Sequence, residues 1–375
     1  MLALVALGCS LALFAAGPVT FEKRPAFRIG NDKIEVLVLP KGAMIASILF
    51  KDDRAQINPL WNSTQLGSAP TPDSPTGHFI AVDGIGEPSA EEKAQGMGAY
   101  GEAWKQQFAL DSSYTAGEGV YELTADLPLA QEHVTRRLTL RKDEEVLQID
   151  TEIESAASFD RPLLWAERAA IGSPFLEPDA TVVDMPAVKS QTRSWTETTG
   201  HRLKAAQEFK WPLAPGNSGK FINLRAAPAA GTSNDQTASL LDPERKTAFV
   251  TMLNTRRRLM LGYLFRTADF PWVENWESYR GPNKLARGLA FGTAPWEMSR
   301  KDALESNSLF GTLFYRWMRA KSKITSRFLM FYTRVPANLV NVDDVRLESG
   351  NIVIEDKVAK INFKIPTKAT MEEQQ

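Results

Sequence analysis

Side chains that alternate between apolar and polar dominate this sequence, and a period of two is typical of β-strands. In the clearest case Leu147, Ile149, Thr151 and Ile153 alternate with Gln148, Asp150, Glu152 and Glu154. Such alternation puts one set of side chains on the core face of a sheet and the other set in water. It recurs at 121–127, while the apolar runs 34–39 and 44–50 indicate more deeply buried strands. Further strands are expected near 247–254, 259–266, 286–292, 327–334 and 358–365.

Helical signals are few and short. Ser89 and Glu92 fit a capping box, and Ser299 can cap a turn or two. The 22 prolines and 24 glycines are spread along the chain without heptads or a repeat, which fits many short antiparallel strands. We therefore predict an all-β fold, a large sandwich or barrel.

The segments that interrupt the strand pattern are interpreted as loops within one domain. Residues 62–77 and 226–242 predict surface loops, because strand patterns of one style flank both segments. No break in composition separates two domains, so one domain is expected over residues 22–366. The polar segment 367–375 is expected to be a frayed tail.

The first 21 residues carry no charge and contain an apolar run that leads to small residues. This pattern predicts an export signal, and hence a periplasmic or extracellular protein. A single membrane anchor is the main alternative, and lipidation of Cys9 is a weaker one. After residue 21 no apolar run approaches the ~18 residues that a membrane span needs, so no other membrane contact is expected.

The composition excludes several classes of function. With 44 basic and 45 acidic residues the net charge is −1, which leaves no excess of positive charge to hold a nucleic acid. One cysteine and three histidines exclude a disulfide framework and cysteine-rich metal sites. No metal motif can be recognised, although scattered acidic residues can bind one calcium ion without leaving a motif.

The segment 96–101 has the letters of a dinucleotide-binding Gly-x-Gly-x-x-Gly motif. That motif requires a strand before it and a long helix after it, and neither pattern is present. We interpret the segment as a glycine-bearing loop that permits tight turns near a binding cleft. No cofactor is therefore expected.

An aromatic and acidic cluster at 270–277 is the first candidate site. With a period of two, Trp272, Glu274 and Trp276 share one face, and Asn275 adjoins Glu274. Indole faces stack on the C–H faces of sugar rings, and a carboxylate beside an indole can have its pKa raised to values useful for a general base. The alternative is a tryptophan-rich corner of the core with exposed carboxylates.

Two further segments contain candidate residues. In 165–168, Glu167 and Arg168 alternate in face, so only one of them can point into a cleft; the alternative is a surface ion pair. His78 begins an apolar strand, where a histidine is either a ligand-binding residue or a hydrogen-bonded structural residue. His133 and His201 have no motif around them.

The order and spacing of several short motifs resemble the aldose 1-epimerase (galactose mutarotase-like) superfamily over about residues 27–335. The motifs are Gly77–Gly86, Gly96–Ala103, Trp165–Arg168 with Gly172–Pro178, and Trp272–Asn275. The resemblance implies a β-supersandwich, an antiparallel fold that agrees with the period of two.

The resemblance also implies a chemistry, from which this sequence departs. In that family a glutamate removes the proton of the anomeric hydroxyl and a histidine protonates the ring oxygen. Glu274 aligns with the base, whereas Tyr100, followed by Gly101 and Glu102, replaces the first histidine and Arg168 the second. An arginine stays protonated and cannot act as a general acid.

We therefore hypothesise a cleft that binds a sugar or oligosaccharide, including acidic sugars such as uronates, with Glu274, Tyr100 and Arg168 at the reacting centre. Arg168 suits a sugar carboxylate through its bidentate fork. The expected substrate contacts are His78, Glu102, Trp272, Asn275 and Trp276. The alternatives are a non-catalytic carbohydrate-binding or envelope-glycan protein and, third, a lyase that uses Tyr100 on an acidic polysaccharide.

Overall fold

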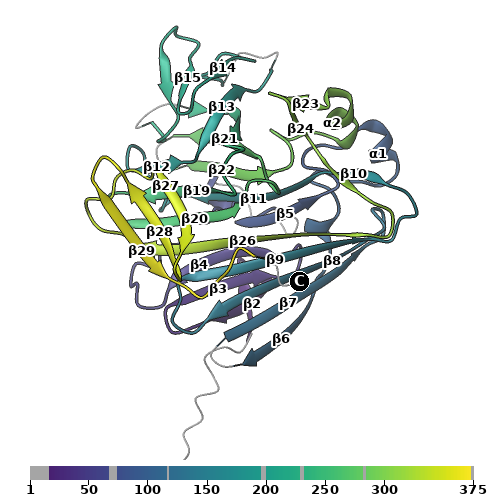
Figure 1. Cartoon of the computed structure of the whole chain (residues 1–375), viewed down its shortest axis with the longest axis horizontal. Helices are drawn as coiled ribbons and strands as arrows, with labels where there is room; N and C mark the ends of the chain where they lie inside the picture. Colours follow the sequence, from purple (N-terminus) through teal and green to yellow (C-terminus); the bar gives the residue numbers. More distant parts are fainter. Residues whose placement is uncertain are drawn as a thin grey trace, which may run out of the picture.

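The computed structural model describes residues 17–66, 74–115, 118–195, 200–228, 232–281 and 284–372. In these ranges the chain consists mainly of antiparallel strands, and two large sheets pack face to face (Figure 1). The predicted all-β sandwich is confirmed. Most of the predicted export signal or anchor, residues 1–16, lies outside the described residues.

The larger sheet has twelve described strands. They are β1 (Gly17–Phe21), β2 (Arg24–Gly30), β3 (Ile34–Leu39), β4 (Met44–Phe50), β5 (His78–Val82), β11 (Trp165–Gly172), β13 (Ala187–Thr192), β14 (Glu208–Phe209), β17 (Thr232–Ser233), β18 (Gln236–Leu241), β21 (Trp272–Arg280) and β22 (Leu285–Gly292). Their order is β1-β2-β3-β4-β5-β11-β22-β21-β18-β13-β14, and β17 pairs with β21. Since β1 pairs with β2 along its whole length, the described fold begins at Gly17, before the expected boundary at residue 22.

The second sheet has eight described strands. In sheet order they are β12 (Thr181–Asp184), β19 (Thr247–Asn254), β20 (Leu259–Arg266), β26 (Lys323–Arg334), β9 (Val146–Ser155), β8 (Glu132–Arg141), β7 (Glu118–Leu127) and β6 (Ala109–Thr115). Leu147, Ile149 and Ile153 of β9 are fully buried against side chains of the larger sheet, such as Ile34 and Ile80. The alternating pattern thus marks the core face, as predicted.

A small C-terminal sheet forms a third layer on the outer face of the second sheet. Its strands are β27 (Asp344–Glu348), β28 (Asn351–Asp356) and β29 (Ile361–Pro366), drawn in yellow near β19 and β20 in Figure 1. Val345, Ile352 and Ile354 pack there against apolar side chains such as Phe249. The described part of the tail is not frayed, because Glu144 accepts hydrogen bonds from the hydroxyl of Thr367 at 2.6 Å and the backbone N–H of Lys368 at 2.7 Å.

Short elements connect the sheets. They are α1 (Ala90–Ala94), α2 (Arg300–Ser306), the 3-10 turns η1 (Ser63–Leu66) and η2 (Ala103–Lys105), and the pairs β10 (Arg161–Leu163) with β25 (Arg316–Met318), β15 (Leu213–Pro215) with β16 (Phe221–Asn223), and β23 (Ser308–Leu309) with β24 (Thr312–Leu313). The capping box of Ser89 and Glu92 is confirmed, and Ser299 caps α2. No helix in the described part of the chain is long and apolar enough to cross a membrane.

The predicted loop 226–242 is wrong in its second half. Residues 236–241 form β18, an inner strand of the larger sheet between β13 and β21. Its threonine and serine side chains are buried, and the hydroxyl of Ser239 is hydrogen-bonded to that of Ser190 at 2.8 Å. The segment is predicted as a loop because it is rich in polar residues, but these residues are buried and form hydrogen bonds inside the fold.

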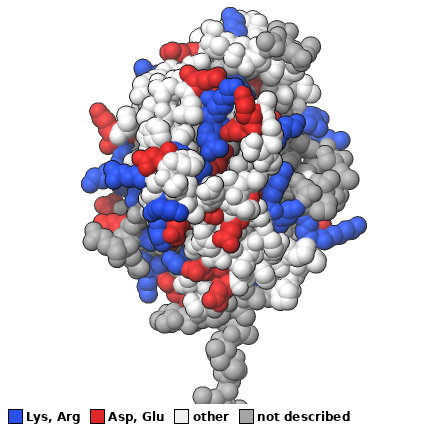
Figure 2. All heavy atoms as spheres, turned by 90° about the vertical axis from the view of Figure 1, so that its right-hand side faces the viewer, with Lys and Arg blue, Asp and Glu red and all other residues white. Residues whose placement is uncertain are grey.

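Charged side chains are mixed over the surface. Figure 2 shows acidic and basic residues interspersed over one face of the molecule, and among the described residues on that face no broad area has a single sign. This distribution agrees with the net charge of −1.

Candidate functional site

Three neighbouring strands of the larger sheet, β11, β22 and β21, form the floor of the candidate site. Their outer face, turned away from the second sheet, presents small side chains along the central strand β22: Ala286, Gly288, Ala290 and Gly292. Arg168 on β11 and Glu274 on β21 both pair with Ala290 in register. Because Ala290 is small, the two long side chains can meet above it.

A pocket of about 220 Å³ opens above this floor. Its walls come from β5, from the segments before and after β5, and from the loop between β22 and α2. The lining residues are Trp61, Pro75, Thr76, Gly77, Phe79, Tyr100, Arg168, Ala169, Ala170, Glu274, Trp276, Gly288, Ala290 and Glu297. The structure thus brings together four of the predicted site residues: Glu274, Tyr100, Arg168 and Trp276.

Two carboxylates hold the guanidinium of Arg168. Its Nη1 lies 3.2 Å from Oε2 of Glu274, and its Nη2 lies 2.6 Å from Oε1 of Glu297. Its Cζ also lies 4.6 Å from the centre of the Tyr100 ring, a cation–π contact. Burial opposes the charge, but the two carboxylates outweigh it and raise the pKa of Arg168 above its ordinary value. Arg168 is therefore a fixed cation with both arms of its fork engaged.

Glu274 is only 3% exposed. Burial raises the pKa of Glu274 to about 7, because the effect of burial and of the nearby Glu297 charge exceeds the opposing effect of Arg168. Its Oε1 and the indole Nε1 of Trp61 are buried and lack a hydrogen-bond partner among the described residues. An acceptor and a donor are thus free for a polar ligand.

Tyr100 is fixed at the rim by its hydroxyl, which donates a hydrogen bond of 2.9 Å to Oε1 of Glu297. Its backbone lies in the left-handed region at φ 62°, and Gly101 follows at φ 74°. Burial raises the pKa of Tyr100 above its ordinary value, so the phenol holds its proton more firmly than in water. Tyr100 is thereby a poor proton donor at neutral pH.

Trp276 stands over Gly288, its partner in register. A Cβ atom at Gly288 would lie 3.2 Å from Cε3 of Trp276, so the missing side chain makes room for the indole. The Trp276 ring meets the Trp61 ring edge to face, with 6.3 Å between centroids. Two indoles thus form the aromatic end of the pocket, opposite the charged end.

His78 lies on the other side of the sheet. Its side chain is fully buried between the two sheets, where Nε2 is 2.7 Å from Oε2 of Glu167 and the ring stacks on Phe328. The next residue, Phe79, is the one that faces the pocket. The expectation that His78 anchors a sugar is therefore corrected, because strand alternation points it into the core.

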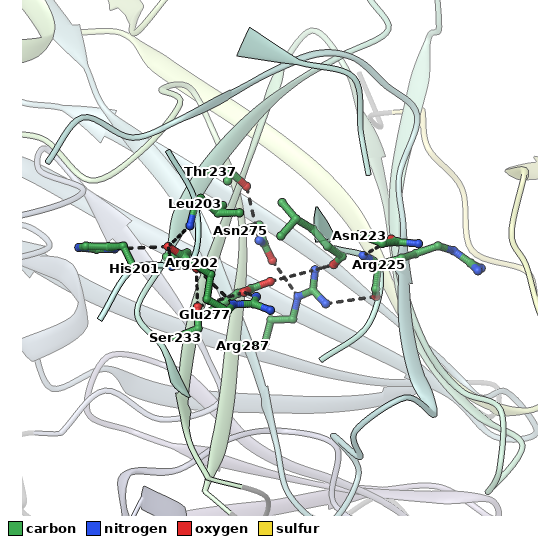
Figure 3. Close-up of polar contacts among 12 residues, drawn as sticks. His201, Arg202, Leu203, Asn223, Arg225, Ser233, Thr237, Asn275, Glu277 and Arg287 are labelled. Atoms are coloured by element: carbon green, nitrogen blue, oxygen red, sulfur yellow. Dashed lines mark hydrogen bonds and ion pairs between the residues drawn. The ribbon is translucent and has the colours of Figure 1, made fainter. Parts of the chain in front are cut away.

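Asn275 also faces inward, for the same reason. Its amide oxygen accepts a 2.7 Å hydrogen bond from Nε of Arg287, and its amide nitrogen donates to Thr237 at 3.4 Å (Figure 3). Arg287 in turn donates to the carbonyl of Leu224. Asn275 is therefore not a substrate contact but part of a buried network that attaches the segment 200–227 to β21.

Two other predicted contacts are structural. Trp272 does share the outer face with Glu274, but it is fully buried under Phe310 and Phe314 and does not line the pocket. Glu102 accepts hydrogen bonds from the backbone N–H groups of Leu129 and Ala130 at 3.0 and 3.1 Å. Its carboxylate is occupied by a loop and does not reach the pocket.

The sequence reasoning missed Glu297 and Trp61. Glu297 follows Trp296 in a loop that no motif identifies, and only the folded chain brings it to Arg168. A usable signal was the run of Ala and Gly at every second position of β22, which marks a strand over which larger neighbours can reach. Within the described ranges, no group of three or more His, Cys, Asp or Glu side chains is placed to hold a metal ion.

The architecture is the galactose mutarotase-like fold, and the resemblance found in the motifs is confirmed at the level of the fold. A galactose mutarotase-like protein from Clostridium acetobutylicum matches with a TM-score of 0.59 and 12% identity, over 86% of this chain and 99% of that chain. A galactose mutarotase related enzyme from Lactobacillus acidophilus matches with a TM-score of 0.55 and 15% identity, over 86% of this chain and 100% of that chain. A scan against protein-family models and a search of curated proteins find no match.

Proposed function

We propose that the pocket binds one sugar ring and that the chain is a carbohydrate-active protein of the mutarotase type. The observation that supports this best is the combination, in one pocket of about 220 Å³, of the unpartnered Glu274 oxygen with the indoles of Trp61 and Trp276. Sites for drug-sized ligands span roughly 300–1,000 Å³, so a single ring suits the smaller pocket.

Opening a sugar ring requires that one group removes the proton of the anomeric hydroxyl and that another protonates the ring oxygen. With a pKa of about 7, Glu274 exchanges protons readily near neutral pH. No histidine lines the described pocket, and Arg168 cannot release its proton. The proposal therefore includes an acid site that differs from that of the epimerases.

The contacts of Arg168 and Tyr100 favour a neutral sugar. Both arms of the Arg168 fork already bind carboxylates, so a uronate carboxylate would have to displace Glu274 or Glu297. The Tyr100 hydroxyl is likewise engaged, and its raised pKa weakens the case for a lyase that uses Tyr100 as a base.

A non-catalytic sugar-binding protein is the second candidate. The ion pair of Glu274 with Arg168 favours it, because the cation makes this buried carboxylate a weaker base than it would be without Arg168. In that case the pocket would bind the ring without opening it.

Exchange NMR on the full chain with a panel of neutral and acidic sugars tests both candidates. We expect faster anomer exchange with a neutral sugar, and Glu274→Gln should abolish it. Glu91→Gln is the matched control, because Glu91 lies on α1 with 67% of its side chain exposed. Line broadening without faster exchange would select the binding protein, and the absence of both would contradict the sugar site.

A further inference from the structure

The pocket contains a second carboxylate, Glu297, whose surroundings differ from those of Glu274. Its Oε1 accepts hydrogen bonds from Nη2 of Arg168 at 2.6 Å and from the hydroxyl of Tyr100 at 2.9 Å. Its Oε2 lies 3.8 Å from Nη1 of Arg193. Two donors and a second cation stabilise a negative charge on Glu297.

Glu274 has fewer direct donors. Among the described residues its ion pair is the longer one, 3.2 Å to Nη1 of Arg168, and its Oε1 lacks a hydrogen-bond partner. Arg193 and the backbone N–H of Glu297 also favour its charged form, but burial and the charge of Glu297 outweigh them. A buried carboxyl with few donors favours its neutral form, which keeps a proton that it can give to a ligand. Both carboxyls line the same pocket and meet the same guanidinium on different nitrogens.

From this arrangement we infer that Glu297 and Glu274 form an acid–base pair, with Glu297 as the base and Glu274 as the acid. The inference rests on the proposed function, and it reverses the role that the family resemblance implies for Glu274. Two carboxyl groups whose surroundings favour opposite protonation states are the arrangement that separates an acid from a base. The raised pKa of Glu274 agrees with the acid role.

The reaction balances with these two groups. The Glu297 carboxylate takes the proton of the anomeric hydroxyl while Glu274 gives its proton to the ring oxygen. The bond between the anomeric carbon and the ring oxygen breaks, and the hydroxyl oxygen becomes a carbonyl oxygen. After the carbonyl group rotates, the reverse transfers close the ring as the other anomer and restore both carboxyls, without any oxidant or reductant.

The pH dependence of anomer exchange tests which residue is the acid. The groups that face Glu274 are Arg168, Glu297, Arg193 and Tyr100, and the pKa of Glu274 itself is raised to about 7. With Glu274 as the acid, the exchange rate, corrected for buffer alone, should fall as the pH rises through about 7. A rate that rises through the same range would make Glu274 the base and overturn the inference.

Glu297→Gln is the second test. We expect it to slow anomer exchange at least about 100-fold while the sugar still binds, as the loss of a general base does. Glu91→Gln should leave the rate and its pH profile unchanged. If Glu297→Gln exchanges anomers at the wild-type rate, or if the wild type binds a sugar without accelerating exchange, the pair is wrong although the sugar site stands. Failure of every sugar to bind would instead contradict the proposed function.

Discussion

Arg168 and Glu274 belong to strands that do not pair with each other, β11 and β21, yet their side chains form an ion pair of 3.2 Å across β22. Both residues pair in register with Ala290, from opposite sides of that strand. A side chain larger than alanine at this position would stand between them. The small residues of β22 therefore leave the space in which the charged side chains of Arg168 and Glu274 meet.

Replacing Arg168 by methionine should leave the buried carboxyl of Glu274 and the half-buried carboxyl of Glu297 without the cation that they share. Without its cation the pKa of Glu274 should rise further above about 7, since Arg168 is the main influence that lowers it. Removing one partner of a buried ion pair costs about 3–5 kcal/mol of unfolding free energy. We expect the loss to be greater at pH ~8 than at pH ~5, because protonation relieves the repulsion.

Chemical unfolding at both pH values measures this difference. Arg168→Lys is the control, because it keeps the positive charge and loses only the second arm of the fork. Equal losses of stability for Arg168→Met at the two pH values would show that repulsion between the carboxylates of Glu274 and Glu297 does not contribute to the loss.

Gly101 determines where Tyr100 lies. A Cβ atom at Gly101 would lie 1.7 Å from the carbonyl oxygen of Val82, and the residue has φ 74°. We expect Gly101→Ala to destabilise the fold and to displace Tyr100 from Glu297. Gly219→Ala is a matched control, because Gly219 has φ 81° with nothing within 4 Å of the added atom.

Urea unfolding separates the two effects. The control should lose only the cost of a left-handed backbone, about 1–2 kcal/mol. Gly101→Ala should lose clearly more, because backbone atoms must also move. If the two variants are equally stable, the contact with Val82 does not restrain the loop.

Local patterns were sufficient to predict most strands and part of the site. The apolar runs 34–39 and 44–50 and the expected strand 247–254 have the bounds that the structure shows. The period of two also placed Trp272, Glu274 and Trp276 on one face, because that property depends only on the spacing of residues within a strand. The same argument predicts that Asn275, as the neighbour of Glu274 in the strand, points to the opposite face and away from the pocket.

The remaining errors come from contacts between segments far apart in the sequence. His78 and Phe79 both lie in a strand that is buried on both faces, so only the pairing of β5 with β11 decides which of them faces the pocket. Glu297 lies 129 residues from Arg168 in the chain, and no local pattern relates them. For Trp272 the sequence predicts the correct face of the strand, but it does not show that Phe310 covers the indole.

Trp272 and Trp276 should respond differently to replacement by alanine. Trp272 is fully buried, so Trp272→Ala should cost about 3–5 kcal/mol of unfolding free energy. Trp276 is half-buried at the pocket, so Trp276→Ala should lower stability less but weaken sugar binding about tenfold. Thermal unfolding measures the loss of stability, and NMR titration with the sugar measures the loss of binding. If Trp272→Ala folds but loses sugar binding while Trp276→Ala keeps it, Trp272 and not Trp276 stacks on the sugar.

Glu167 should make the fold sensitive to acid. It lies fully buried between the sheets, where Arg136 donates to both its oxygens at 2.8 and 2.9 Å and His78 lies 2.7 Å away. Burial alone would raise its pKa, but Arg136 and His78 outweigh burial and lower the pKa of Glu167 to about 2. The Glu167 carboxyl therefore binds a proton more weakly in the folded state than in the unfolded state. Its contribution to the free energy of unfolding is present above about pH 4.5 and is lost as the pH falls toward about 2.

The size of that contribution can be measured. A shift from 4.5 to about 2 corresponds to roughly 3 kcal/mol of unfolding free energy. The lowered pKa of the buried His78 acts in the same direction, because that ring must become charged in acid. The free energy of unfolding of the wild type should therefore fall steeply between pH ~5 and pH ~2. Glu167→Gln should already be less stable at pH ~7, because it leaves the buried charge of Arg136 without a partner. It should lose less stability than the wild type between pH ~5 and pH ~2. Parallel pH profiles for the two proteins would show that the acid sensitivity arises elsewhere.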